Sequence, residues 1–533
     1  MDSDLESRNS GHRELPRRQV IITMAGVMLA LFFASLDQTI VGTALPRIIT
    51  DLGGFAHYTW VATAYIITST VTLLIAGKLS DMYGRKWFLV GGIAVFIVGS
   101  ILCGSSQTMN QLIGFRALQG IGAGAIMGMA FITVGDLFPA AERGKYVGFL
   151  TGVFGLSSVI GPTLGGFITD NFSWNWVFYI NIPFGILIMI LFIIFFPHIR
   201  PGIQKHRVDY GGIATLILTV VPFMLALTWA GVEYEWLSFP IVFLFAFSAA
   251  MLLLFIIIES RAKEPVLPLW IFRNRVVSVA SIVTFILGFG MFTGIIFIPL
   301  YFQGVLGSSA TASGSFLTPM MLGLVVGSIV SGQLLARAGG HYRIQGAVGI
   351  IFMAVGLFLL SRMTVDTSYA TAIMNIIIMG LGLGITMPVY VIAIQNAVPY
   401  SIMGVATSTN AFFRSIGGAV GLAIAGSVMN NRFADDFTGG LPPEISAVIP
   451  SEQLSSLAEN PQALVSPEAQ DQLRGFFESM GSQGAQFFQQ LLSTMREALN
   501  SALTEVFFVA FCAIAVAFII NLFLKEIPLR KDK

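Results

Sequence analysis

Residues 77–89 read GKLSDMYGRKWFL and place four charged side chains between two long apolar runs. The runs, at about residues 57–79 and 87–106, are each long enough to cross a hydrocarbon core of about 30 Å as a helix. Composition alone favours an ordinary basic loop here, but Asp81 lies among the three cations. The stretch predicts a membrane protein whose charges are concentrated in the connections between spans.

The whole chain has the composition of a polytopic membrane protein. Of its 533 residues 55% are apolar and 11% are charged, and the mean hydropathy is +0.81; a soluble protein carries roughly a quarter charged residues. Gly, Pro and charged residues divide the apolar runs into fourteen predicted helices. They cover about residues 20–43, 57–79, 87–106, 110–138, 144–169, 174–196, 208–231, 236–258, 276–303, 310–336, 343–361, 369–397, 403–430 and 504–524.

The basic residues predict the orientation in the membrane. An even number of spans puts both termini on one side, and 22 of the 29 Lys and Arg residues then fall on that side. Five lie on the other side and two within spans: Arg47, Arg362, Arg432, Arg474 and Arg496, then Arg116 and Arg414. Because cytoplasmic loops carry the excess of basic residues, we expect a multi-pass protein of the cell (plasma) membrane with both termini in the cytoplasm.

An internal repeat predicts two six-helix bundles. GKLSDMYGRKWF at residue 77 aligns with GQLLARAGGHYR at 332, and GFLTGVFGLSSVIGPTLGG at 148 with GVATSTNAFFRSIGGAVGL at 404, at offsets of 255 and 256 residues. Chance similarity of Gly-rich segments is the alternative. The predicted organisation is a cytoplasmic tail (1–19), an N-terminal six-helix bundle (20–197), a linker with two additional spans (198–275), five helices of a C-terminal bundle (276–430), an extracytoplasmic loop (431–503), the last bundle helix (504–524) and a second cytoplasmic tail (525–533).

Two ionisable residues within spans predict a functional site. Asp37, in SLDQTIVGTALP (35–46), and Arg116 each lie about six residues, or roughly 9 Å, from the same end of their helices. A charged group at such depth is costly unless it is paired, hydrated or neutralised. Gly42 is read as a close-packing position and Pro46 as marking the helix end. The alternatives are that Asp37 makes only an N-cap-like or interhelical hydrogen bond, for which Thr39 and Thr43 are candidate partners, and that Arg116 has a purely structural role.

Protonation of Asp37 offers a mechanism of exchange. A lipophilic cation favours the carboxylate, whereas a proton arriving from outside neutralises it and releases the cation, and this competition is antiport. At the other membrane face, one or both of the carboxylates Asp81 and Asp136 are expected to pair with Arg85 and form a latch. The predicted cytoplasmic gate comprises Gly77, Asp81, Gly84, Arg85, Lys86 and Asp136.

These motifs resemble the major facilitator superfamily, in its fourteen-helix drug:proton antiporter branch. GKLSDMYGRK matches a signature loop except at Met82, where a basic residue is usual, while LDQTIVGTALP and LIGFRALQGIGAGA (112–125) resemble motifs of helices one and four. GFLTGVFGLSSVIGPTLGG is similar to the antiporter motif of helix five, and EPVLPLWIFRNR (264–275) to the segment leading into the second bundle. The antiporter motif contributes Gly148, Gly161, Pro162, Gly165 and Gly166. The resemblance implies an all-α fold of two bundles with two inserted helices, a central cavity lined by helices one and four, and export.

Substrate candidates combine polar or aromatic character with a position near the cavity. They are Trp60, Tyr65, Gln119, Gln303, Asn410 and Arg414; Trp60 is alternatively an interfacial anchor. Between residues 276 and 430 the only acid is Asp366, in a loop, so Arg414 is expected to stand alone near mid-membrane. One carboxylate in the pathway predicts a low proton stoichiometry.

The sequence therefore predicts a monomeric transporter that exports lipophilic, cationic or neutral drugs in exchange for protons. Its expected partners are small lipophilic molecules, protons and the bilayer, with no nucleic acid, no cofactor, no metal and no enzymatic activity. Export of an endogenous lipid, peptide or amino acid is the alternative, which Arg414 would suit. Residues 431–503 contain nine acids and helical apolar spacing, which predicts amphipathic helices on the outer face, acting as a lid or forming a solvated excursion.

Overall fold

The computed structural model describes residues 16–52, 58–197, 207–231, 233–307, 310–337, 341–446 and 482–528, with a few single positions between 449 and 477. Within these ranges fourteen helices are long and apolar enough to cross a membrane, which confirms the predicted all-α class and the number of spans. The long helices are α2 (Arg17–Leu52), α3 (Tyr58–Tyr83), α4 (Arg85–Gly104), α5 (Met109–Leu137), α6 (Ala140–Asn171), α8 (Asn181–Phe195), α9 (Tyr210–Trp229), α10 (Phe239–Arg261), α11 (Arg275–Leu300), α12 (Ala310–Arg337), α13 (Tyr342–Leu360), α14 (Tyr369–Ala397), α15 (Met403–Gly440) and α19 (Ser482–Asn521). Shorter segments are α7 (Trp176–Tyr179), η2 (Leu269–Arg273), η3 (Tyr301–Val305), η4 (Tyr400–Ile402) and α16 (Pro443–Ser446).

Local sequence signals set several helix ends. Gly84, at φ 97°, separates α3 from α4, and this left-handed conformation favours glycine because a Cβ would be strained there. The N-cap side chains of Thr108, Asp209 and Asn274 accept hydrogen bonds from backbone N–H groups at the starts of α5, α9 and α11, at 3.3, 2.8 and 2.9 Å. Each cap satisfies a donor that the helix itself leaves free.

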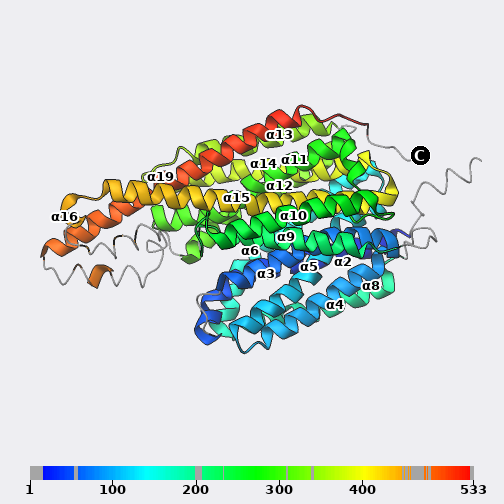
Figure 1. Ribbon diagram of the computed structural model, residues 1–533, viewed down its shortest axis with the longest axis horizontal. Coiled ribbons are helices and arrows are strands. Elements are labelled where there is room, and N and C mark those ends of the chain that lie inside the picture. The colour runs from blue at the N-terminus through cyan, green and yellow to red at the C-terminus, as the bar shows by residue number, and fades with distance from the viewer. Residues whose placement is uncertain are drawn as a thin grey trace, which may run out of the picture.

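The helices form two groups, and two pairs of helices make the largest contacts between them. The first half comprises α2 to α8, the second α11 to α19, and α6 packs on α12 while α3 packs on α15. We call the side where α2 begins and α19 ends the terminal face, and the opposite side the loop face; the C terminus leaves at the right of Figure 1. A Cβ on Gly144 would lie 2.5 Å from the Gly332 carbonyl oxygen, and one on Gly148 would lie 2.7 Å from that of Ser328. The α6 and α12 backbones are therefore in direct contact in their terminal-face halves.

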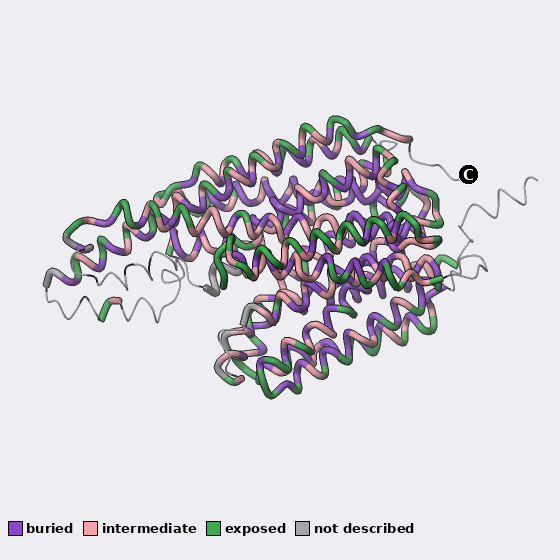
Figure 2. Tube along the Cα trace, viewed as in Figure 1, coloured by how far each residue is buried: buried purple, intermediate pink, exposed green. Residues whose placement is uncertain are grey.

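Burial follows the position of each helix in the bundle. Most of α14 is buried, whereas only four residues of α10 are, and this contrast is visible in Figure 2. α9 and α10 pack against each other, with Ser248 Oγ donating to the Thr219 carbonyl at 2.7 Å, and α9 also contacts α3 and α15. The inserted pair thus leaves one apolar face of α10 for lipid.

Three helices extend beyond the predicted spans. α2 continues past residue 46 to Leu52, so Pro46 does not mark its end. α15 runs ten residues beyond the predicted end at 430, and α19 begins at Ser482, before the predicted start at 504. The two extensions project together past the other helices at the left of Figure 1 and do not lie flat across the loop face. Their contact is apolar, since Phe433, Phe437, Leu491 and Leu499 are fully buried.

The glycines of the antiporter-like segment differ in their packing. On α6, a Cβ at Gly161 would clash with Thr39, and one at Gly165 with Thr43 and with the Ile40 carbonyl oxygen, all on α2. A Cβ at Gly166 would meet no atom within 4 Å. The same is true of Gly42, so its interpretation as a close-packing position is wrong: it lies on a side of α2 that no neighbouring helix approaches.

We predict opposite effects for alanine at two adjacent glycines of α6. Gly165→Ala forces α6 away from α2, and overpacking of this kind typically costs about 1–3 kcal/mol. Gly166→Ala meets open space and gains about 0.5–1 kcal/mol of helix propensity. The apparent melting temperature of the purified protein should therefore fall for the first variant and stay equal or rise for the second. Equal destabilisation by both would contradict the packing described.

Candidate functional site

The carboxylate of Asp37 lies fully buried where several helices of the first half converge. Oδ2 accepts a hydrogen bond from Arg116 Nη1 at 2.5 Å, and Oδ1 accepts from Gln119 Nε2 and Asn181 Nδ2, each at 2.8 Å. These donors come from α5 and α8, while Asp37 belongs to α2. The predicted proximity of Asp37 and Arg116 is confirmed, and both carboxylate oxygens are occupied.

The guanidinium of Arg116 has further partners in the same cluster. Nη1 also donates to Gln119 Oε1 at 2.7 Å, and Nε donates to the Val61 carbonyl of α3 at 3.3 Å. Its Cζ atom lies 4.1 Å from the ring centroid of Tyr65, whose hydroxyl donates to the Ala34 carbonyl at 3.0 Å. A cation over an aromatic face gains attraction from the ring quadrupole, more so when water is excluded. Tyr65 and Gln119, predicted as substrate candidates, are thus parts of the ion-pair network.

Two members of this network escaped prediction. Asn181 lies at the start of α8, and Ser100 of α4 accepts from Gln119 Nε2 at 2.8 Å. Both are isolated polar residues in apolar runs, INIPFGILIM and FIVGSILCG, which is the signal that was available. They matter because buried polar groups need partners, and they complete the shell around Asp37 and Gln119.

The arrangement can respond to a proton. With Asp37 ionised, the pair is neutral and satisfied by hydrogen bonds, as a buried pair must be. Protonation of Asp37 would leave Arg116 as a buried cation without a counter-ion, so its partners would have to rearrange or an anion would have to approach. The network therefore has two electrostatic states that differ by one proton. Its role in proton coupling stays a prediction.

A second charged cluster closes the terminal face. Arg85 pairs with Asp81, its Nε donates to Asp136 Oδ2 at 2.9 Å, and its Nη1 donates to Ser80 Oγ at 2.6 Å. Asp81 Oδ2 also accepts from the backbone N–H of Val405 at 2.9 Å, at the start of α15. One or both acids were predicted to pair with Arg85, and both do; Asp81 also links the two halves.

Glycines allow this link to form. A Cβ on Gly77 would clash with Ser408 of α15, and one on Gly404 would clash with Asp81 and lie 2.7 Å from Arg85 Nη1. Gly404 was not predicted as a gate residue. Within the described residues, further bonds between the halves follow toward mid-membrane: Gln395 Nε2 to the Phe131 carbonyl at 3.2 Å, Ser328 Oγ to the Gly148 carbonyl at 2.9 Å, and Thr70 Oγ1 with Ser415 Oγ at 2.7 Å.

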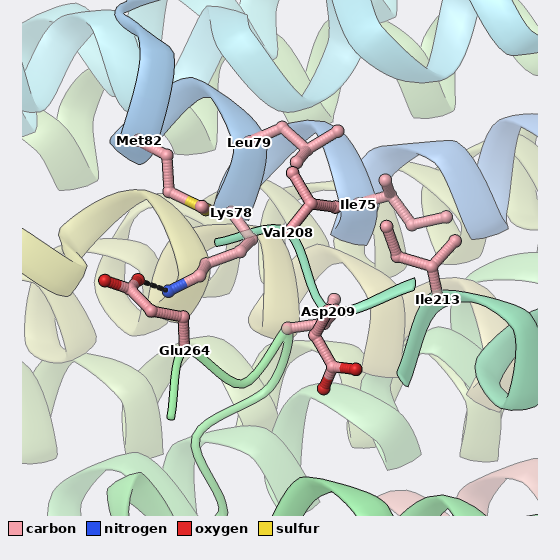
Figure 3. A pocket seen from close by; sticks show the side chains of 9 residues that line it. Ile75, Lys78, Leu79, Met82, Val208, Asp209, Ile213 and Glu264 are labelled. Atoms are coloured by element: carbon pink, nitrogen blue, oxygen red, sulfur yellow. Dashed lines mark hydrogen bonds and ion pairs between the residues drawn. The ribbon is translucent and has the colours of Figure 1, made fainter. Parts of the chain in front are cut away.

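Other charges of the signature loop point elsewhere. Lys86, predicted as part of the gate, donates to the Ile193 carbonyl near the end of α8 at 2.7 Å and stays within the first half. Lys78 forms an ion pair of 3.1 Å with Glu264 in the segment before η2. Figure 3 shows this pair at a pocket whose other side is formed by Asp209 and Ile213 at the start of α9. Met82, where a basic residue is usual, is buried and lines the same pocket.

The remaining substrate candidates lie outside the Asp37 cluster. Trp60 packs edge-on against Trp229 of α9, with ring centroids 5.2 Å apart. Asn410 Nδ2 donates to Thr284 Oγ1 at 2.8 Å and joins α15 to α11, while Gln303 lies in η3. Arg414 is half-buried and lies on α15 near mid-membrane. Whether these residues contact substrate stays a prediction.

Two packed groups of apolar helices, with charges buried between and within them, are the architecture of a membrane transporter. Residues 27–422 match the model of the Major Facilitator Superfamily, and the chain belongs to this family. It is 41% identical to the multidrug transporter protein MdtP of Bacillus subtilis over 97% of this chain and 95% of that protein. It is 38% identical to multidrug resistance protein 3 of the same organism, over 94% of each chain. Among solved structures, the proton:xylose symporter XylE matches with a TM-score of 0.59 at 12% identity, covering 95% of each chain, which supports the fold alone.

We predict non-additive effects on stability at the Asp37–Arg116 pair. Asp37→Asn leaves the guanidinium buried without its counter-ion, and breaking a buried pair in this way typically costs about 3–5 kcal/mol. Adding Arg116→Gln removes that unpaired charge, so the double variant should melt at a higher temperature than Asp37→Asn alone. If the two substitutions simply add, the pair is not coupled as its geometry indicates.

We predict that Arg85, and not its neighbour Lys86, keeps the terminal face closed. Ser408→Cys, in a background with Cys103→Ser and Cys512→Ser, places a thiol beside Gly77, inside the contact between the halves. Adding Arg85→Gln should raise the rate of maleimide labelling several-fold, because Asp81 and Asp136 lose their shared cation. Adding Lys86→Gln should leave the rate unchanged, since this ammonium contacts only the first half. Equal rates in the two variants would exclude the latch.

Proposed function

We propose that this chain is a secondary active transporter that exports lipophilic, cationic or neutral compounds in exchange for protons by alternating access. The observation that supports it most is the buried Asp37 carboxylate, held by Arg116, Gln119 and Asn181 within the first half. A single ionisable acid that is fully coordinated inside a membrane protein is a functional residue by default. Because this carboxylate can bind and release one proton, each transport cycle can be coupled to the movement of that proton.

The proposed coupling uses competition at this carboxylate. A proton that enters from the outside neutralises Asp37 and weakens its hold on Arg116, whereas a bound lipophilic cation favours the ionised form. Substrate and proton then oppose each other by a coupling free energy, which is reciprocal by linkage. Asp81 and Asp136 lie at the terminal-face ends of α3 and α5, whereas Asp37 lies well inside α2. With one such carboxylate deep in the described spans of the first half, we propose a low proton stoichiometry.

The proposed orientation places the terminal face in the cytoplasm. The excess of Lys and Arg in the connections on that face supports it, as does the polar segment that precedes α2. The Asp81–Arg85–Asp136 latch then closes the cytoplasmic side, and breaking it is the step that admits substrate from the cell. The protein would act as a monomer in the plasma membrane, since each chain contains both halves of the rocking unit.

The names of its relatives support a drug as the cargo. Two Bacillus proteins of similar length and more than a third identical residues are described as multidrug transporter and multidrug resistance proteins. The chain also supplies 45 Phe and 22 Met residues, large adaptable side chains of the kind that promiscuous sites use. Drugs are therefore the class of cargo that we propose for this chain.

We predict that Asp37→Asn separates active transport from exchange. In proteoliposomes, an imposed pH gradient should drive accumulation of a lipophilic dye by wild type and not by Asp37→Asn, because the amide cannot bind the transported proton. Counterflow of labelled against unlabelled dye moves no net proton, so it should persist in Asp37→Asn or in the double variant Asp37→Asn/Arg116→Gln. Persistent counterflow would show that the variant protein is folded.

A matched control exists on the same helix. Asp51→Asn makes the same substitution at the exposed loop-face end of α2, where the carboxylate accepts from Trp174 Nε1 at 3.0 Å, and gradient-driven accumulation should be retained. Undiminished accumulation by Asp37→Asn would remove this carboxylate from the mechanism. Dye accumulation by neither wild type nor Asp51→Asn would count against drug efflux itself.

A further inference from the structure

Arg414 is a cation near mid-membrane that has no partner among the residues the structure describes. It lies eleven residues into α15, about 16 Å along the helix from the terminal face, and the next residue, Ser415, contacts Thr70 in the middle of α3. Among the described residues no hydrogen bond or ion pair involves its guanidinium, and the side chain is half-buried. A charge at this depth is costly unless water or a ligand reaches it.

Three other interior arginines have hydrogen-bond or ion-pair partners. Arg116 has three hydrogen-bond acceptors, Arg85 has two carboxylates and a hydroxyl, and Arg143 donates to the Phe138 and Gly135 carbonyls at 2.9 Å each. Asp366 is the only acid between residues 276 and 430, and it lies in the connection between α13 and α14. No carboxylate in the neighbouring spans of the second half is therefore available to Arg414.

The side of α15 that carries Arg414 faces the interior. Residues three or four positions apart share a helix face, and on this face Asn410 bonds Thr284 of α11 while Thr407 accepts from Gln395 of α14 at 3.3 Å. One turn beyond Arg414 on the same face, a Cβ on Gly418 would clash with the Phe292 ring of α11. Arg414 thus lies where α15 packs against α11, since a Cβ on Gly288 would clash with its carbonyl oxygen, and the adjacent Ser415 contacts the first half.

The Asp37 carboxylate is less available than Arg414 to bind a ligand in this conformation. Both of its oxygens are occupied by donors of the first half, whereas the guanidinium N–H groups of Arg414 have no acceptor within the described part of the chain. A planar guanidinium matches a carboxylate through two parallel hydrogen bonds, and such charge-assisted bonds are roughly twice as strong as neutral ones. The half-buried ring of Phe292 lies one turn away and can contact an apolar or aromatic body.

We propose that Arg414 is a substrate subsite that binds the carboxylate of a lipophilic aromatic compound. This inference rests on the proposed export function and narrows its cargo to include amphipathic acids and zwitterions. Neutral and cationic compounds would occupy the apolar part of the same space without using Arg414. The subsite would thus discriminate between an acid and its ester.

The test is binding of two dyes that differ only in this group. Rhodamine B has a free carboxylate, which its ethyl ester lacks, and fluorescence anisotropy reports the binding of each to the purified protein in lipid nanodiscs. We expect Arg414→Gln to weaken rhodamine B binding about tenfold or more, the loss of a charge-assisted hydrogen-bonded pair, and to change ester binding less than twofold. Arg414→Lys should restore part of the affinity for the acid.

Arg432→Gln is the matched control, because it makes the same substitution on the exposed extension of α15, and it should alter neither dye. Equal weakening of acid and ester by Arg414→Gln, or absence of rhodamine B binding to wild type while the ester binds, would overturn the subsite. Because binding needs no proton gradient, this outcome is independent of whether active efflux fails. Conversely, selective loss of the acid would support the subsite even if proton coupling failed its own test.

Discussion

The ion pair between Asp37 and Arg116 is the constraint around which the first half is built. A membrane interior tolerates a charge only when a counter-charge and hydrogen bonds surround it, so helices α2, α3, α4, α5 and α8 must converge on one point. The network fixes the packing of these helices, and the carboxylate at its centre has two protonation states. A shared structural and electrostatic role explains why so many polar groups meet at one carboxylate.

The two halves are electrostatically unequal. The first half holds its charges in satisfied clusters, one around Asp37 and one around Arg85, and the second holds, at Arg414, a cation that no described residue pairs with. The described contacts between the halves run from the terminal-face ends, through Asp81 and Val405, to Thr70 and Ser415 near mid-membrane. A transporter needs a contact between its halves that can close and open again. The glycines let the helix backbones approach closely there, so that a small contact area is well packed.

The sequence predicted the parts of the structure that depend on periodicity and on isolated charges. Fourteen spans, the depth match of Asp37 with Arg116, and the pairing of Asp81 and Asp136 with Arg85 follow from those signals.

Asn181 and Ser100 were missed because a single polar residue in an apolar run does not indicate its partner. The helix extensions of α15 and α19 were missed because hydropathy ends a span at the membrane boundary, whereas their helices continue by packing on each other. Lys86 and Gly42 show that a motif does not reveal which neighbour a residue faces.

The central claim, that substrate and proton exclude each other at Asp37, can be measured without transport. A weakly buffered solution of the purified protein is mixed with a lipophilic cationic dye at a series of pH values, and a pH indicator reports the protons released. The account predicts that wild type releases protons in proportion to bound dye, while Asp37→Asn binds the cationic dye more weakly and, at dye concentrations that restore the same occupancy, releases none. Equal proton release by both proteins at equal dye occupancy would contradict it.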